Sequence, residues 1–409
     1  MTAQVLVWLG IAVMLVGAAT AHGLLTVLGI MLITVSGLSW LWATHLLNNV
    51  AAAVQLERSL ARYGDAVEGA LVVENDQPFP VPWLECHTEW PADLPSLTSQ
   101  LSSHYKANRM LLMHVLSLGW FERVIRRFRV RCLHRGEFVF GPTDLTAADP
   151  FGFFEGRSTT SSTSRLVIYP RISPVRFRTA SPQSPFGDRR ATSWIYDDPV
   201  RFRGAREYMP GDPFSRIEWK ATARTGQLHT RVFDASLATE VGLVVNVSTK
   251  ERAWEGIGRQ WLERTLAVGA SLLAHLSERG FRVGVYTNGF VRGQSGSAMV
   301  TMGAGDAHLR QCLKLLGRLM PVSGARFPVV LDRIAGRVSD HAQIMVITPM
   351  LSAEITRACL RHRSRGRTPV VFFTGPADDF RGGPIPAFKV QPEGGPEDLD
   401  EIILSPAGQ

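Results

Sequence analysis

The first fifty residues contain no Asp, Glu, Lys or Arg. An uncharged run of this length is too long for one membrane span, which needs about 20 residues to cross about 30 Å of hydrocarbon. Ala21, His22 and Gly23 can form a turn within it. We therefore predict two transmembrane helices within residues 1–50, over about residues 4–20 and 24–46, with Trp40 and Trp42 in the interfacial aromatic belt.

A cleaved signal peptide is the alternative for this segment, because the residues Ala-Thr-Ala at 19–21 resemble a cleavage site. Two features argue against it: no Lys or Arg precedes the apolar run, and a second apolar run follows at once. Arg58 and Arg62 come soon after the second span, whereas the tip between the spans has neither residue type. The positive-inside rule then predicts a two-span protein of the inner (cell) membrane with most of the chain in the cytoplasm.

Common metal and catalytic signatures are also missing. The four cysteines form no CxxC pair, which excludes a disulfide framework and a cysteine zinc site: Cys86, Cys132, Cys312 and Cys359. No P-loop, HExxH or G-x-S-x-G motif occurs, so we expect no cofactor, no metal and none of the corresponding hydrolytic mechanisms. The net charge of +8 is moderate and no basic tail is present, which argues against a nucleic-acid partner.

Residues 51–185 have the pattern of a β-rich domain. In "RFRVRCLHRGEFVF", Phe128, Val130 and Cys132 alternate with arginines, as in a strand that is buried on one face. Short strands separated by turns are typical of a small β-sandwich. Residues 180–200 are rich in Pro, Ser, Gly and charged residues, and we predict that residues 186–235 form a linker that leads into a short helix.

From residue 236 the pattern changes to alternating buried strands and helices. "EVGLVVNVS" is a continuous apolar run, and similar runs alternate with helical stretches up to residue 380. This alternation predicts a doubly wound, mostly parallel α/β sheet over residues 236–380, followed by a C-terminal tail at 381–409. In such sheets ligands bind at the carboxyl ends of the strands.

One stretch of the linker region, "REYMPGDPFSRIEWKATARTGQL", carries an unusual set of cations. Asp212 suits a helix N-cap and Gly226 suits a helix end, which predicts a helix from 213 to about 224. Arg216, Lys220 and Arg224 would then share one face, and each neighbouring pair would repel by about 0.2–0.5 kcal/mol. We expect an anionic group to compensate this repulsion.

Two interpretations of these cations remain open. They can clamp carboxylates where two domains meet, and Arg206, Tyr208 and Trp219, which look like parts of a packed unit, favour this interpretation. Alternatively, the cations are exposed and bind an acidic protein face, lipid headgroups or phosphate.

Three stretches together resemble the bacterial family called domain of unknown function 58: "GPTDLTAADPFGFF", "VIYPR" and, above all, the pattern R-x-Y-x-x-G-D-x-x-x-R-I-x-W-K-x-x-A-R. The resemblance runs over most of the chain. It implies a membrane-anchored β-domain followed by a von Willebrand factor A-like domain, and a partnership with a MoxR-type AAA ATPase or its client protein. It implies no chemical mechanism.

Metal-binding A-domains carry D-x-S-x-S after their first strand, with a later aspartate after a central strand. Here the loop is "NVSTK", so Asn246 replaces the aspartate, Ser248 matches and Lys250 replaces the last serine. Thr348 stands where the later aspartate is expected. Because hard cations require oxygen ligands, preferably charged ones, we predict a degenerate site that binds no metal and serves in partner docking. Lys250 either takes the place of the ion or is a solvated loop residue.

The sequence therefore favours an interaction or scaffold protein over an enzyme. We expect docking of a MoxR-type ATPase or its client through Asn246, Ser248, Lys250 and Thr348. The cations that share one helix face, Arg216, Lys220 and Arg224, are a second predicted site. A hydrolase with an unrecognised site and a binder of anionic lipid or polymer remain as alternatives.

Overall fold

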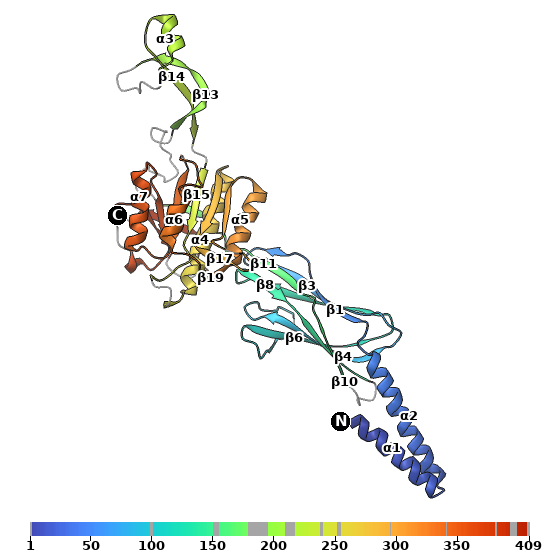
Figure 1. The fold of residues 1–409 in the computed structure, drawn as a ribbon. Coiled ribbons are helices and arrows are strands. Elements are labelled where there is room, and N and C mark those ends of the chain that lie inside the picture. Colours follow the sequence, from blue (N-terminus) through green and yellow to red (C-terminus); the bar gives the residue numbers. More distant parts are fainter. Residues whose placement is uncertain are drawn as a thin grey trace. The chain divides into compact units, whose positions relative to one another are not determined.

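The computed structural model describes residues 2–98, 101–149, 155–178, 195–208, 217–237, 240–251, 255–294, 296–340, 342–380, 383–392 and 399–406. The chain divides into two compact units, Met1–Tyr169 and Pro170–Gln409. Figure 1 shows the elements of both, and each unit is described by itself.

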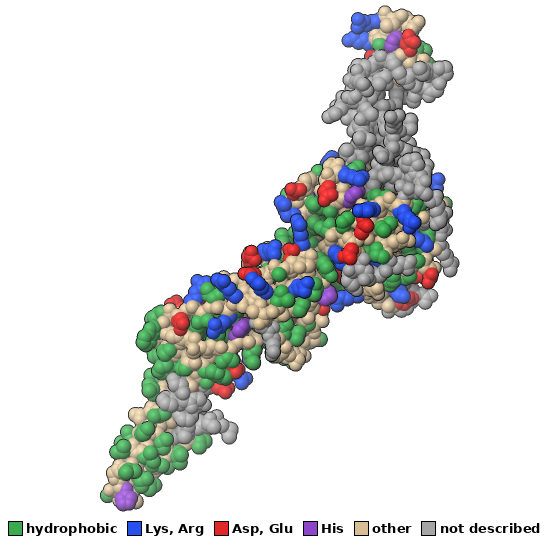
Figure 2. All heavy atoms as spheres, turned by 180° about the vertical axis from the view of Figure 1, so that it is seen from behind, with side chains coloured by type: hydrophobic (Ala, Val, Ile, Leu, Met, Phe, Trp, Pro, Cys, Tyr) green, Lys and Arg blue, Asp and Glu red, His purple; other side chains and the backbone are tan. Residues whose placement is uncertain are grey.

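The first unit begins with two apolar helices, α1 (Thr2–Ala19) and α2 (Gly23–His45), which pack side by side (Figure 1). A Cβ atom added at Gly17 would lie 2.5 Å from the backbone nitrogen of Thr26, so the absence of a side chain lets the two backbones approach closely. Hydrophobic side chains cover the surface of this hairpin (Figure 2). Within the described residues, one segment, Gly23–Trp42, is long and apolar enough to cross a membrane, and α1 contributes the shorter apolar stretch Val7–Ala19.

The rest of the first unit is β-structure in several sheets, as predicted. One sheet has the order β1 (Val50–Leu56), β3 (Ala66–Asn75), β7 (Arg123–Arg131). A second has the order β10 (Glu155–Thr160), β9 (Thr143–Ala148), β4 (Val81–Pro91), β6 (Arg109–Leu118), β5 (Leu101–Ser103). A third has the order β2 (Leu60–Ala61), β11 (Ser164–Ile168), β8 (Gly136–Phe140).

Strand β7 confirms the alternation expected from its sequence. Phe128 and Val130 are buried, whereas Arg127, Arg129 and Arg131 are exposed. The period of two residues places successive side chains on opposite faces, so one apolar face can reach the core while the arginines stay hydrated.

Trp90 lies at the centre of the core that these sheets enclose and is fully buried. Its ring meets Phe128 and Phe140 edge to face, with centroid distances of 5.1 Å and 4.9 Å. Its indole N–H donates to the carbonyl of Leu94 at 2.7 Å, so the one polar atom of the side chain is satisfied.

The second unit is built on an eight-stranded mixed sheet. Its order is β12 (Val175–Phe177), β23 (Ile402–Pro406), β22 (Ala387–Gln391), β21 (Val370–Phe373), β20 (Gln343–Thr348), β15 (Glu240–Val245), β16 (Arg282–Thr287), β18 (Met299–Gly303). Strand β15 runs parallel to both β16 and β20, and β21 and β22 continue the parallel arrangement. The segment expected as a C-terminal tail contributes β22 and β23 to this sheet.

Helices cover both faces of the sheet: α4 (Arg259–Glu278), α5 (Asp306–Arg318), α6 (Phe327–Ile334) and α7 (Ala353–Ser364). On one face Val244 of β15 belongs to the same buried cluster as Ile334 of α6 and Ala358 of α7. On the other face a Cβ added at Gly269 of α4 would lie 3.6 Å from Val245. A small two-stranded sheet pairs β17 (Gly289–Val291), which directly follows β16 in the chain, with β19 (Leu319–Ser323).

The segment expected as a linker contains an antiparallel pair, β13 (Ile195–Glu207) with β14 (His229–Leu237), and the short helix α3 (Trp219–Thr225) between them. The predicted start of this helix at residue 213 is wrong. Ile217 forms a β-bridge with Thr230, and Glu218 occupies the N-cap, so the helix cannot include them. Gly226, with φ of 75°, ends the helix as predicted.

The aromatic centre of the first unit gives a stability prediction. Replacing Trp90 by Ala should lower the free energy of unfolding of this unit by about 3–5 kcal/mol, because a large buried ring and its hydrogen bond are lost. Calorimetry of the full chain in detergent measures the effect. The matched control is Tyr105→Ala, whose ring is 87% exposed and whose loss should cost less than about 0.5 kcal/mol. Equal losses for the two variants would show that Trp90 does not centre the core.

Candidate functional site

Three polar side chains follow neighbouring parallel strands of the second unit. Asn246 follows β15, Asn288 follows β16, and Thr348 ends β20; all three are fully buried. The Asn246 Nδ2 donates to the Thr348 Oγ1 at 3.0 Å, and the Asn288 Nδ2 donates to the Asn246 Oδ1 at 3.0 Å. Because the carboxyl ends of parallel neighbours meet at one edge, segments far apart in sequence converge here. We call Asn246, Ser248, Asn288 and Thr348 the amide cluster.

Hydrogen bonds within the amide cluster engage both polar atoms of the Asn246 side chain. Its Oδ1 accepts a second bond from the backbone N–H of Ser248 at 3.0 Å. The Asn288 Nδ2 also donates to the Ser248 Oγ at 2.9 Å, and the Thr348 hydroxyl donates to the Met350 carbonyl at 2.5 Å. The cluster is therefore a neutral network of mutual hydrogen bonds in a buried place, where an unpaired polar group would be costly.

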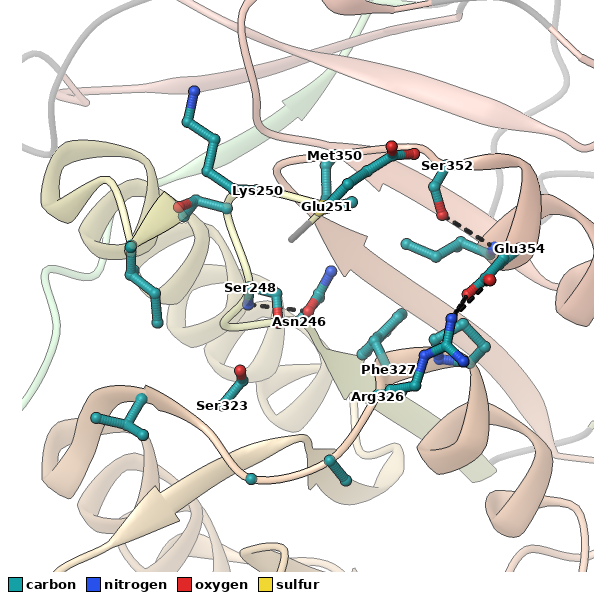
Figure 3. A pocket seen from close by; sticks show the side chains of 18 of the residues that line it. Asn246, Ser248, Lys250, Glu251, Ser323, Arg326, Phe327, Met350, Ser352 and Glu354 are labelled. Atoms are coloured by element: carbon teal, nitrogen blue, oxygen red, sulfur yellow. Dashed lines mark hydrogen bonds and ion pairs between the residues drawn. The ribbon is translucent and has the colours of Figure 1, made fainter. Parts of the chain in front are cut away.

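A cleft of about 680 Å³ opens above the amide cluster (Figure 3). Its walls come from the loop after β15, the segment from β19 to the start of α6, and the beginning of α7. Apolar side chains make up much of its lining: Ile257, Pro321, Val322, Phe327, Pro328 and Met350. The Ser248 side chain is half-buried, so of the cluster members predicted from sequence it is the one that a ligand in the cleft can touch.

The charged residues of the cleft lie at its rim. Arg326 Nη2 donates to both carboxylate oxygens of Glu354 at 2.6 Å, and both side chains are substantially exposed. Lys250 is exposed, and Figure 3 shows its chain pointing away from Asn246 and Ser248. The Lys250 ammonium therefore does not lie beside the amide cluster, and its role in docking stays a prediction.

The structure thus unites Asn246, Ser248 and Thr348 but gives them unequal roles. Asn246 and Thr348 are fully buried and hold the loops together, and Asn246 also lines the cleft; the predicted docking role of these residues stays a prediction. Asn288 was missed. Its signal was available, because it lies near the end of the strand-like run "FRVGVYTNG" and carboxyl ends of parallel strands gather ligand-binding side chains.

The amide cluster does not suit a divalent metal. Its oxygen atoms are neutral and already take part in mutual hydrogen bonds. Among the residues that the structure describes, no group of three or more His, Cys, Asp or Glu side chains could hold a metal ion. Mg²⁺ and Ca²⁺ sites need several oxygen ligands, commonly with carboxylates among them.

One cysteine–histidine pair in the second unit has a geometry that invites a catalytic interpretation. Cys312 Sγ lies 3.4 Å from His308 Nε2 on helix α5. The same nitrogen lies 2.7 Å from the carbonyl of Val283, an acceptor, so it must carry the proton and cannot take one from the thiol. Burial also raises the pKa of Cys312 to about 12. The pair is structural.

The cations of the family-like motif are exposed where the structure describes them. Lys220 and Arg224 on α3 are solvent-exposed within the second unit, and both interpretations of these cations stay predictions. Trp219 is 67% exposed within this unit.

Other motif residues are placed only in part. The backbone N–H of Tyr208 donates to the Leu228 carbonyl at 2.8 Å, which closes the end of the β13–β14 pair. Arg206 lies in β13 opposite Thr230. Asp212 and Arg216 lie outside the described residues.

The network predicts a pH-dependent cost for Asn246→Asp. The protonated acid can replace the amide donor to Thr348, but the carboxylate cannot, and full burial raises its pKa above the unfolded value of about 3.9. A raised folded-state pKa means stability that is present at low pH and lost as pH rises. We expect a deficit of about 1–3 kcal/mol at pH 7 that shrinks towards pH 4.

The measurement is thermal unfolding of each variant against the parent chain at both pH values. Asn108→Asp makes the same charge change at an exposed position and is the control. A deficit at residue 246 that is independent of pH would contradict the description of the amide cluster as a buried neutral network.

One comparison with known proteins matches the part of the chain that holds the amide cluster. Residues 204–378 match the model of a family described as "Protein of unknown function DUF58". "Uncharacterized protein YeaD" of Bacillus subtilis (strain 168) is 21% identical over 277 residues, which cover 68% of this chain and 64% of that relative, slightly less than two thirds of its length.

Solved structures give weaker likenesses. The CARDB domain of the PF1109 protein from Pyrococcus furiosus is 12% identical with a TM-score of 0.21, over 30% of this chain and 90% of that one. A cohesin module from a Clostridium perfringens family 33 glycoside hydrolase is 16% identical with a TM-score of 0.21, over 29% and 97%. Scores this low establish neither fold nor function, so the similarity that counts is the family match over residues 204–378, which contains both the cationic motif and the amide cluster.

Proposed function

We propose that this protein is a membrane-anchored interaction protein, whose cleft above the amide cluster binds a protein partner without metal and without catalysis. The observation that carries the proposal is the chemistry of the cleft floor. A 680 Å³ opening lies over side chains that are neutral and hydrogen-bonded to one another. The floor residues Asn246 and Ser248 can shape a binding surface and carry no carboxylate, thiolate or imidazole; the carboxylates that line the cleft, Glu251 and Glu354, are exposed.

The second unit is proposed to be a doubly wound, von Willebrand factor A-like domain. The support is its parallel central strands β16, β15, β20 and β21 with helices on both faces. The loop after β15 lies where metal-binding A-domains carry D-x-S-x-S. In this chain Asn246 replaces the aspartate, and Asn288 supplies a second amide that fixes the loop through the Val247 N–H at 2.9 Å.

The anchor is proposed to be both helices of the hairpin, with the remainder of the chain in the cytoplasm. Helix α2 meets the length and apolarity that a span requires, and α1 packs against it through glycines. The support for orientation is Arg58 and Arg62, which follow the hairpin closely. Four unpaired cysteines fit a reducing compartment.

The partner is proposed to be a MoxR-type AAA ATPase or its client protein. Apolar walls, the half-buried Ser248 hydroxyl and the exposed ammonium of Lys250 at the rim suit a segment that combines apolar residues with a carboxylate. The Arg326–Glu354 pair neutralises the opposite side of the rim, which leaves Lys250 as the cation available to the partner. A rim charge of this kind acts mainly on association and specificity.

A second candidate function, binding of an anionic lipid or polymer, is favoured by one observation. Lys220 and Arg224 are exposed on α3, whose described residues include no buried side chain. Each exposed cation near an anionic surface contributes about 1 kcal/mol, so two give only weak attraction. This site would act beside the cleft rather than in place of it.

The positive charge of Lys250 at the rim of the cleft can be reversed without disturbing the fold. Lys250→Glu in the full chain should reduce capture of a purified MoxR-type ATPase encoded by the same genome by about tenfold, which corresponds to about 1.4 kcal/mol. Affinity capture in detergent at fixed salt measures this. Lys314→Glu, on the exposed side of α5, makes the same change away from the cleft and should leave capture unchanged. Undiminished capture by the Lys250 variant would remove the rim from the proposal.

Metal independence gives a separate expectation. Addition of Mg²⁺ or Mn²⁺ at millimolar concentration should leave the melting temperature of the parent chain unchanged. A bound ion would raise it, because a ligand at one hundred times its Kd adds about 2.7 kcal/mol to the free energy of unfolding. Calorimetry with and without EDTA provides the comparison. A clear rise of the melting temperature, abolished by Ser248→Ala, would place an ion at the amide cluster and overturn this part of the proposal.

A further inference from the structure

The turn between β6 and β7 presents two large aromatic side chains to solvent. Trp120 is 72% exposed and Phe121 is 66% exposed. Phe121 has a φ of 49°, a conformation that is uncommon for a bulky residue. The turn is nevertheless well defined, because the Glu122 carboxylate accepts the Gly119 N–H at 2.5 Å. The fold thus holds these rings outside its own core.

Hydrogen bonds connect this turn to the end of the apolar helix α2. The Phe121 N–H donates to the Gln77 carbonyl at 3.2 Å. The buried Gln77 side chain in turn donates to the Leu46 carbonyl at 2.9 Å, one residue beyond the end of α2. Ser39 of α2 also donates to the buried Asp149 carboxylate. The exposed rings therefore lie at the end of the β-structure that receives the membrane helix.

Further aromatic residues gather at the same end. The Trp42 indole donates to the Pro80 carbonyl at 3.2 Å, and its ring meets Phe79 edge to face at 5.9 Å. Trp40 is 58% exposed and Trp83 is 39% exposed. The apolar segment of α2 ends at Trp42, so these rings occupy the level at which a span leaves the hydrocarbon. Aromatic side chains concentrate at that level in membrane proteins.

The opposite end of the same strand pair has a different character. Leu118 pairs with Val81 next to the turn, whereas Arg109 pairs with Pro91 at the far end of β4. The ten residue steps between these pairs along β4 span about 33 Å. Near the far end Lys106 forms an ion pair with Glu89. The far end thus carries an ion pair and the exposed Tyr105, whereas the turn carries Trp120 and Phe121 next to the charged Glu122 and Arg123.

We propose that Trp120 and Phe121 insert into the headgroup–acyl boundary of the bilayer that α2 crosses. This inference rests on the membrane anchor in the proposed function. The first unit is then attached to the membrane at two places, the helix and the turn. Two attachment points fix its orientation relative to the bilayer, whereas one would let it rotate. The occupant is the bilayer because the surface is continuous with the membrane helix.

Cysteine labelling can test the proposal on the full chain. The native cysteines do not interfere, since all four are fully buried: Cys86, Cys132, Cys312 and Cys359. Burial raises the pKa of the Cys132 thiol to about 11 and that of the other three to about 12, which keeps them protonated at labelling pH. A newly exposed cysteine is therefore the one that reacts.

We would place an environment-sensitive nitrobenzoxadiazole label at residue 121 through Phe121→Cys and at residue 120 through Trp120→Cys. Tyr105→Cys, at the far end of the strand pair and 87% exposed, is the matched control for an aqueous position. Met31→Cys, 61% exposed on α2, reports on the hydrocarbon. Each variant is reconstituted into phosphatidylcholine–phosphatidylglycerol vesicles that contain nitroxide lipids labelled near the headgroup or deep in the chain.

The expected result is blue-shifted emission at residues 120 and 121 and quenching by the shallow nitroxide at least threefold stronger than at residue 105. If residue 31 is quenched while residues 120 and 121 behave like residue 105, the inference is overturned and the anchor stands. If residue 31 is not quenched either, the anchor itself fails. Blue-shifted emission at 120 and 121 without lipid quenching would mean a protein contact, which also overturns the inference.

Discussion

The hydrogen bonds of the Asn246 amide tie together the ends of three strands, and the site depends on them. Asn246 contributes both a donor and an acceptor, which an aspartate would not. Thr348 and Asn288 fit that polarity: one receives the amide proton and the other supplies one. The network is therefore built for an amide. A carboxylate at this position would face a hydroxyl already committed to the Met350 carbonyl.

This polarity separates recognition from chemistry. An ion-binding loop presents oxygens that remain available until the cation arrives, whereas here the side-chain oxygens of the cluster already take part in hydrogen bonds within the protein. The walls of the cleft then determine what binds, through apolar surface and a few charges at the rim. Arg326 is held by Glu354, so the charge distribution is uneven and Lys250 is the prominent cation. The buried cluster shapes the loops, and the rim selects among partners.

Local patterns predicted much of this fold, and long-range contacts account for what they missed. The alternation around Phe128 and the apolar run before Asn246 each identify a strand, because the residue period alone decides which faces are buried. The start of α3 could not be predicted in this way. Ile217 pairs with Thr230 across the chain reversal, and that contact overrides the good local capping signal at Asp212 and Pro213. Asn288 was missed similarly, since its role requires knowing that β16 lies beside β15.

Exposure alone does not identify a functional surface, as two tryptophans of this chain illustrate. Trp120 and Trp219 are exposed to a similar extent, 72% and 67%. Trp219 lies on a helix with no described element that indicates what would cover it. Trp120 lies in a turn whose backbone is hydrogen-bonded, through Gln77, to the end of an apolar helix that is long enough to cross a bilayer. A bilayer that accepts α2 therefore brings its interface to Trp120. Insertion there removes the unfavourable free energy of exposing the indole ring to water, and no partner protein is needed.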